Sequence, residues 1–109
     1  MSVLSVLFQG RTRLAEIGWT QGAHARMADG KMFRFDWDRG QPAVAYSANG
    51  AIGGNDVVDM MKARVRLWEA LGDGQAGYSN LSDWNDAPER TRAEVVALYE
   101  AAIESMVAA

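Results

Sequence analysis

The sequence predicts a mainly α fold of the α+β class, a small bundle of about four helices with one short β-hairpin after the first helix. Two observations lead to this class. Four segments carry apolar residues at helical spacing. One Asp-Gly pair stands between residues that alternate in polarity, which is typical of a hairpin. At 109 residues the chain is expected to form a single domain over 1–109.

The first predicted helix covers residues 3–17, where Ser2 can cap the start and Gly18 can end the helix. Gly10 lies in its middle and weakens an isolated helix by about 1 kcal/mol relative to Ala. We therefore expect a close helix contact at Gly10. The apolar residues that define its inner face are Val3, Leu7, Leu14 and Ile17.

The predicted hairpin covers residues 23–36 and turns at the Asp-Gly pair at 29–30. On its outgoing strand, Phe33 and Phe35 alternate with charged residues, as in a half-buried strand. A lone two-stranded hairpin is marginally stable in water. We therefore expect Phe33, Phe35 and Trp37 to pack it against the helices.

Two helices are predicted in the middle of the chain. Pro42 suits the first turn of a short helix over 42–52. A longer helix is predicted over 56–71, with Asn55 or Asp56 as its N-cap. The apolar stripe of this longer helix is expected to face the core and consists of Val57, Met61, Val65, Trp68 and Leu71.

The last predicted helix covers residues 92–107 and follows the dense motif S-D-W-N-D-A-P-E-R-T at 82–91. Thr91 and Glu94 form the T-x-x-E pattern of a capping box, in which each residue satisfies a backbone N–H of the other. This cap explains the end of the motif. It does not explain Trp84-Asn85-Asp86, which lies further upstream.

Composition and charge exclude several classes of function. The chain has no cysteine, which excludes a disulfide scaffold, a Cys-ligated zinc site and a thiol nucleophile. Its net charge of −3 disfavours nucleic-acid binding. No apolar run approaches the ~18 residues that a membrane span needs, and no signal peptide is seen. We therefore expect a cytoplasmic, acidic protein.

No motif predicts catalysis. His24, Ser47 and an Asp would supply the parts of a triad, but a G-x-S-x-G elbow is absent. The glycines within 49–54 lack the lysine of a phosphate-binding loop. The Asp pairs at 36/38 and 56/59 lack the spacing of a calcium loop. We therefore expect no catalytic residue, no metal and no cofactor.

The Trp84-Asn85-Asp86 stretch allows two readings. Asn85 and Asp86 can form an Asx-turn in a structural corner, or Asp83 and Asp86 can accept from a ligand beside the Trp84 ring. The structural corner is favoured. Tryptophans also serve as interface hot spots, and three of the four lie near element ends. The candidate binding residues are Trp19, Gln21, His24, Trp37, Trp84, Asn85 and Asp86.

Three motifs lie along the chain: G-W-T-Q-G-A at 18–23, A-Y-S-A-N-G-A-I at 45–52 and W-N-D-A-P-E-R-T at 84–91. Together they resemble an uncharacterised family of small bacterial and phage-borne proteins, a domain of unknown function. Ser47 stands where that family usually has Cys. The resemblance covers most of the chain and implies no reaction. It implies that one packed feature contains Trp19, Gln21, Trp84, Asn85 and Asp86.

Two hypotheses of function follow from the sequence. The first is a non-catalytic protein-interaction module of phage or accessory-genome type, acting as an inhibitor or regulator of a host or phage protein. Its basis is the tryptophan content, the acidic second half and the lack of a catalytic motif. The alternative is a small-molecule or nucleotide-binding protein, or an enzyme, with a pocket at the corner of the hairpin and Trp84. A homodimer is a third option.

Overall fold

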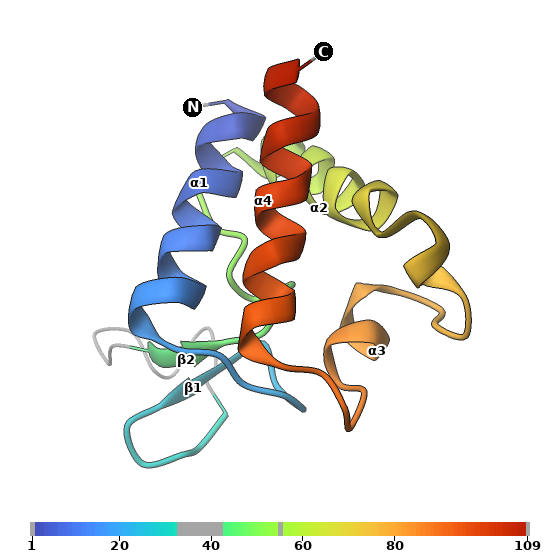
Figure 1. The fold of residues 1–109 in the computed structure, drawn as a ribbon. Helices are drawn as coiled ribbons and strands as arrows, with labels where there is room; N and C mark the ends of the chain where they lie inside the picture. Colours follow the sequence, from blue (N-terminus) through green and yellow to red (C-terminus); the bar gives the residue numbers. More distant parts are fainter. Residues whose placement is uncertain (1, 33–42, 55, 109) are drawn as a thin grey trace.

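Three long helices form the helical core of the protein in the computed structural model, which describes residues 2–32, 43–54 and 56–108. A small antiparallel sheet and a fourth, short helix complete this described part (Figure 1). In chain order the elements are α1 (Val3–Thr12), the π-helical turn η1 (Arg13–Ile17), β1 (Ala25–Met27), β2 (Ala43–Tyr46), α2 (Val57–Leu71), the 3₁₀ turn η2 (Gly72–Gln75), α3 (Leu81–Asn85) and α4 (Arg92–Ala108). The predicted class, mainly α with a two-stranded antiparallel sheet after the first helix, is confirmed.

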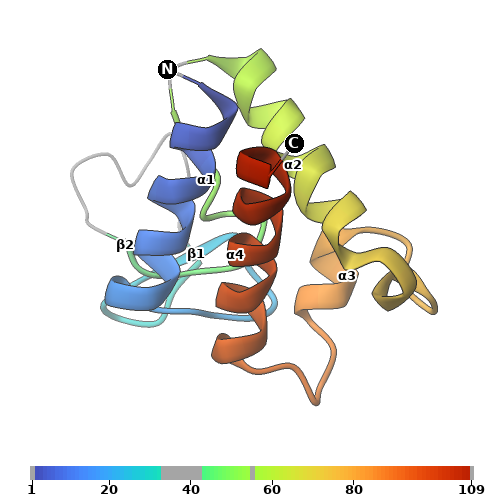
Figure 2. The same cartoon turned by 45° about the horizontal axis from the view of Figure 1, so that its top comes forward.

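The three long helices pack against one another, and α1 and α4 lie side by side with opposite directions (Figure 1). Their two free ends therefore lie at the same end of the molecule, while the sheet and α3 lie at the other (Figures 1 and 2). The buried core runs between these helices. Its largest fully buried apolar side chains are Val6, Leu7, Leu14, Leu67, Val95 and Tyr99.

Gly10 lies at a close contact between α1 and α4. A Cβ built on Gly10 would stand 2.5 Å from the Tyr99 ring and 3.1 Å from the Ala51 carbonyl oxygen. The contact expected from the sequence is therefore present. Tyr99 is fully buried, and its hydroxyl donates a hydrogen bond to the carbonyl oxygen of Ala48. The glycine thus makes room for the ring that links α4 to the segment after β2.

The predicted short helix over 42–52 is wrong. Residues 43–46 instead form β2, which pairs with β1 in the register Ala25↔Tyr46, Arg26↔Ala45 and Met27↔Ala43. Tyr46 also exchanges backbone hydrogen bonds with Gly18 and Thr20 on its other side. Two sets of backbone partners therefore hold this segment extended and override its weak helical pattern. The short helix of the fold is α3 instead.

The predicted hairpin is present in part. The Met27 N–H donates to the Lys31 carbonyl oxygen, and Gly30 has a φ of +83°, as a tight turn requires. An antiparallel bridge joins Arg26 to Met32. The rest of the outgoing strand, 33–36, lies outside the described residues, as does Trp37. The strand that forms the ladder with β1 is β2, a pairing that the sequence did not predict.

The capping box before α4 is confirmed. The Thr91 N–H donates to Glu94 Oε1 at 3.0 Å, and the Glu94 N–H donates to Thr91 Oγ1 at 3.3 Å. At the start of α2, Asp56 accepts from the N–H groups of Val58 and Asp59. Both helices therefore begin where their capping side chains stand.

The inner face of α2 agrees with the predicted stripe only near its C-terminal end, where Trp68 and Leu71 pack against the core. Ala63 and Leu67 are buried, while Val57, Met61 and Val65 are exposed. The helix carries apolar residues on more than one face, so its periodicity alone does not select the side that meets the core. On the buried face of α2, the side chain of Ala63 is small, so α2 can approach the other helices closely there.

Candidate functional site

Asn85 is the centre of the Trp84 corner and is completely buried. Its Oδ1 accepts from the Trp19 indole Nε1 at 2.7 Å and from the Ala48 N–H at 2.9 Å. Its Nδ2 donates to the Thr20 carbonyl oxygen at 3.1 Å and to Asp86 Oδ1 at 3.0 Å. The amide therefore makes all four of the hydrogen bonds that it can form. No bonding capacity is left for a ligand.

Gln21 and Asp86 form further hydrogen bonds between the chain that follows η1 and the end of α3. Gln21 Nε2 donates to the carbonyl oxygens of Asn85 at 2.9 Å and Ala87 at 2.7 Å. In return, Asp86 Oδ1 accepts from the Gly22 N–H at 2.9 Å. These bonds tie the chain after η1 to the end of α3.

Trp84 belongs to the core and is 5% exposed. The Arg90 guanidinium lies over its indole ring, 4.0 Å from the centroid, and Arg90 Nε donates to the Trp84 carbonyl oxygen. Arg90 also forms an ion pair with Glu94, so this cation is already engaged. Neither the Trp84 ring nor Arg90 is presented to a partner.

The structure brings together the five residues that the resemblance implied to be one packed feature. Trp19, Gln21, Asn85 and Asp86 are joined by hydrogen bonds, and Trp84 lies directly beside them in α3. This arrangement favours the structural reading of the corner. A small cavity of about 260 Å³ does border it, lined in part by His24 and Asp86. Of the remaining candidates, Trp37 lies outside the described residues.

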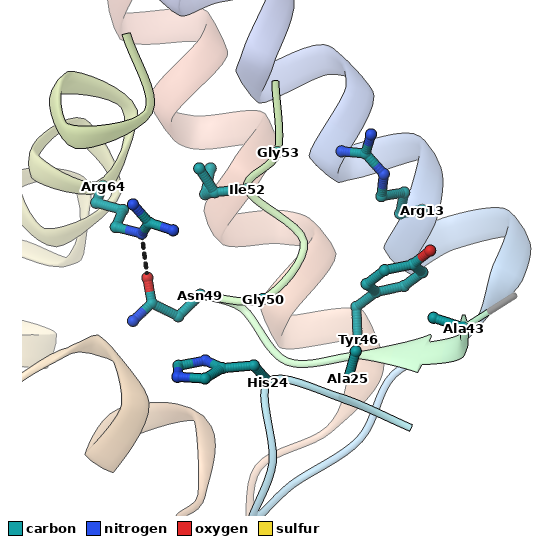
Figure 3. Close-up of a pocket in the computed structure, with 10 residues that line it drawn as sticks. All are labelled: Arg13, His24, Ala25, Ala43, Tyr46, Asn49, Gly50, Ile52, Gly53 and Arg64. Atoms are coloured by element: carbon teal, nitrogen blue, oxygen red, sulfur yellow. Dashed lines mark hydrogen bonds between the residues drawn. The ribbon is translucent and has the colours of Figure 1, made fainter. Parts of the chain in front are cut away.

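His24 lines a second, larger pocket of about 600 Å³, between the sheet, the end of α1 and α2 (Figure 3). We call it the two-arginine pocket. Figure 3 shows Arg64 extending from α2 and Arg13 from the helical segment that follows α1, with residues 49–53 also lining the space. The lining residues are Arg13, His24, Ala25, Ala43, Tyr46, Asn49, Gly50, Ile52, Gly53 and Arg64.

Both arginines are held in place by the segment after β2. Arg13 Nη1 donates to the Ala51 carbonyl oxygen at 2.9 Å, and its guanidinium lies against Gly53. Arg64 Nε donates to Asn49 Oδ1 at 2.7 Å. Each guanidinium has five N–H donors, so these bonds orient the groups and leave most donors available.

The described residues that line the two-arginine pocket include two arginines and no Asp or Glu, so they give the pocket a positive charge. Among the described residues, neither Arg13 nor Arg64 takes part in an ion pair. The charges of both arginines also act on a buried group of the core. Burial raises the pKa of the Tyr99 hydroxyl, and the charges of Arg64 and Arg13 oppose that rise. The pocket therefore suits an anion.

A third feature is an apolar strip on the outer side of α2, which we call the α2 apolar face. Val57, Val58, Met61 and Val65 are 62%, 56%, 59% and 57% exposed. They follow one another at spacings of one, three and four residues, so they form one continuous surface. Isolated exposed apolar residues are ordinary, but a contiguous strip is typical of an interaction site.

Ser47 is buried, and its hydroxyl accepts from the Gly50 N–H. The described residues contain no group of three or more His, Cys, Asp or Glu side chains placed to hold a metal ion. Within the same residues, no helix has the length and apolar character needed to cross a membrane.

Sequence reasoning missed both the two-arginine pocket and the α2 apolar face. Arg13 and Arg64 stand in different helices far apart in the chain, and no motif surrounds either one. The α2 residues were recognised as an apolar stripe, but they were assigned to the core. The presence of a second apolar side on α2, around Ala63 and Leu67, was the available signal.

The fold and these surfaces define a class: a small α+β protein in which a hydrogen-bonded corner locks a three-helix core. The chain belongs to a family of unknown function, DUF6197, whose model matches residues 1–105. No curated protein and no solved structure matches the chain. The family membership agrees with the resemblance that the three motifs carried.

Proposed function

We propose that this protein is a non-catalytic interaction module, of phage or accessory-genome type, that acts in the cytoplasm as an inhibitor or regulator of a host or phage protein. The observation that carries the proposal is the α2 apolar face. Fully burying a Val or Met side chain contributes about 1.5–3 kcal/mol. A partner that covered the four apolar side chains of this face, each more than half exposed, would gain a substantial part of the free energy of a specific complex.

The shape of the face suits a helix from a partner. From Val57 to Val65 the strip spans about 12 Å along α2, at 1.5 Å per residue. A second helix that crosses it can place two or three apolar side chains against the strip. This mode of recognition needs no groove on the surface of the module.

Charged residues beside the strip indicate which charges the partner helix carries. Lys62 and Arg66 stand one turn apart along one edge of the strip. Glu69 lies one turn beyond Val65. We therefore expect an amphipathic partner helix with acidic residues beside its apolar face.

The same charges disfavour a second copy of the chain. In a two-fold pairing centred on Met61, Lys62 of one copy would lie opposite Lys62 of the other. Like charges placed in this way oppose association. The occupant of the α2 apolar face is therefore a different protein.

The test is a pulldown from lysate of the native host with three immobilised proteins: wild type, Met61→Glu and Val107→Glu. Val107 is an exposed apolar residue on α4 and provides the matched control. We expect one stoichiometric partner on wild type and on Val107→Glu, lost with Met61→Glu. The purified partner should then bind the wild type through a helix with acidic edges.

Two results would overturn the proposal. In the first, wild type and Met61→Glu retain the same proteins, or neither retains a stoichiometric one. In the second, light scattering finds a wild-type dimer that Met61→Glu dissociates, which would assign the face to a second copy.

A further inference from the structure

We propose that the two-arginine pocket is a binding site for a small organic anion, and that Arg13 and Arg64 donate to its phosphate or carboxylate oxygens. This site is separate from the α2 apolar face and goes beyond the proposed interaction with a protein. It is also distinct from the cavity beside the saturated Asn85 corner, where a ligand pocket was expected from the sequence, although His24 lines both spaces.

The first argument is charge. Two guanidinium groups line one pocket, and none of the other described lining residues is a carboxylate, in a chain whose net charge is −3. Both side chains are half-buried, so part of their hydration is already lost. Guanidinium groups in such places bind carboxylates and phosphates strongly, since their bonds to an anion are charge-assisted.

The second argument is preorganisation. The bonds of Arg13 to the Ala51 carbonyl and of Arg64 to Asn49 fix both groups before any ligand arrives. Anchoring the segment after β2 uses only one N–H of each guanidinium. A ligand that accepts from the remaining donors therefore loses little free energy in ordering these side chains.

The third argument is the size and lining of the pocket. Its volume of about 600 Å³ lies within the range of small-molecule sites and far exceeds the space that inorganic phosphate needs. Ala25, Ala43 and Ile52 supply apolar wall, and the Tyr46 ring supplies an aromatic surface (Figure 3). The ligand is therefore an organic molecule with an anionic end and an apolar or ring portion.

The experiment is calorimetry on the full chain with three probes: AMP, citrate and adenosine. AMP carries a phosphate on a ring-bearing body, citrate carries carboxylates, and adenosine is AMP without the charge. We expect AMP or citrate to bind with a Kd of about 1 mM or lower and adenosine to bind at least about tenfold more weakly. Binding of AMP alone assigns the site to a phosphate, and binding of citrate alone assigns it to a carboxylate.

Variants identify the pocket. Arg64→Met should weaken binding by about tenfold or more, whereas Arg66→Met should leave it unchanged. Arg66 is exposed on the same helix, so the control makes the same change in net charge outside the pocket. Thermal unfolding verifies that both variants fold.

Amide chemical shifts of the wild type provide a readout that does not depend on a variant. Tyr46, Asn49, Gly50 and Gly53 should shift on titration with the bound anion. The proposal is overturned if neither anion binds below about 10 mM, if adenosine binds as well as AMP, if Arg66→Met weakens binding as much as Arg64→Met, or if the shifts lie elsewhere. None of these results depends on Met61, so this proposal and the protein-interaction proposal fail separately.

Discussion

Asn85 is a buried polar side chain whose partners lie on three separate parts of the chain: Trp19 and Thr20 before β1, Ala48 after β2, and Asp86 beside it. Such a side chain stabilises one arrangement of the segments because any other arrangement leaves buried groups unpaired. The residue therefore specifies the fold as well as stabilising it.

We expect Asn85→Asp to lower the free energy of unfolding by about 2–4 kcal/mol, because a carboxylate oxygen would face the Thr20 carbonyl and the Asp86 carboxylate. Urea unfolding measures the change. The matched substitution Asn49→Asp keeps the bond from Arg64 Nε and should stay within about 0.5 kcal/mol of the wild type. Equal effects of the two variants would mean that the Asn85 network does not exist in solution.

The Glu94 carboxylate makes the stability of the folded protein depend slightly on pH in the acidic range. The hydrogen bond from the Thr91 hydroxyl, followed by the contacts with Arg90, lowers the pKa of Glu94 below its ordinary value of 4.5. A group whose pKa is lower in the folded state stabilises that state above the ordinary pKa and loses this contribution as the pH falls through the folded pKa.

We therefore expect the melting temperature to fall between about pH 5 and pH 3, and to fall less in Glu94→Gln than in the wild type. Calorimetric scans across this range measure the difference. Glu104→Gln is the control, since Glu104 is an exposed glutamate on the same helix. An identical slope for wild type and Glu94→Gln would contradict a role of the capping box in acid stability.

Contacts between helices, rather than helix propensity, decide the effect of substitutions in α1. Ala favours an isolated helix over Gly by about 1 kcal/mol. At Gly10, however, the added methyl would stand 2.5 Å from the Tyr99 ring. We expect Gly10→Ala to cost about 2–3 kcal/mol, measured by urea unfolding.

Gly72→Ala is the comparison for that substitution. No atom lies within 4 Å of a Cβ built on Gly72, whose φ is +52°. Only the backbone conformation opposes the change there, at a cost of about 1–3 kcal/mol, because a φ of +52° with a ψ of −121° is strained for a residue that has a Cβ. A Gly10→Ala variant more stable than the wild type would show that α1 and α4 are further apart than the structure has them.

The two apolar sides of α2 differ in what they stabilise. Leu67 is fully buried, so Leu67→Ala should cost about 2–5 kcal/mol. Met61 is exposed, so Met61→Ala should change the free energy of unfolding by less than about 0.5 kcal/mol. Chemical denaturation of both variants compares the two faces directly. A large loss of unfolding free energy in Met61→Ala would show that Met61 belongs to the core, and the basis of the interaction surface would be removed.

The elements that the sequence predicted well are those determined locally. The segment 3–17 is helical as α1 and η1, and the start of α4 follows from the Thr91–Glu94 cap. The strand β2 depends instead on partners at both of its edges, which no local pattern of residues 43–46 reveals. The inner face of α2 likewise depends on what packs against it.

The candidate sites also divide into one that local motifs predict and one that depends on contacts between distant segments. The corner was anticipated through motifs that hold Trp19, Gln21 and Asn85 together, and the structure joins them by hydrogen bonds. The two-arginine pocket was not anticipated, because Arg13 and Arg64 line one pocket only when α1, β2 and α2 have assembled. An isolated arginine in a helix is most often a solvated residue, so neither position stood out.

At the scale of the whole molecule, segments from the two ends of the chain hold each other. The α1 helix packs on α4 (Figure 2), Arg11 pairs with Glu100, and the chain after η1 is fastened to the end of α3 by Gln21 and Asn85. Contacts between distant segments are lost together, because separating α4 from α1 also exposes the Tyr99 ring and the bond it makes to Ala48. These couplings leave little scope for one part to unfold alone.

We therefore expect a single cooperative unfolding transition. Tryptophan fluorescence reports partly on the corner, through Trp19 and Trp84, while far-ultraviolet circular dichroism reports on the helices. The two signals should give the same urea midpoint, and Asn85→Asp should shift both midpoints equally although it lies in no long helix. If fluorescence changed at a lower urea concentration than dichroism, the corner would be a separate unit attached to a stable helical bundle. The proposed pocket, which needs both the sheet and the helices, would then exist only while that unit was folded.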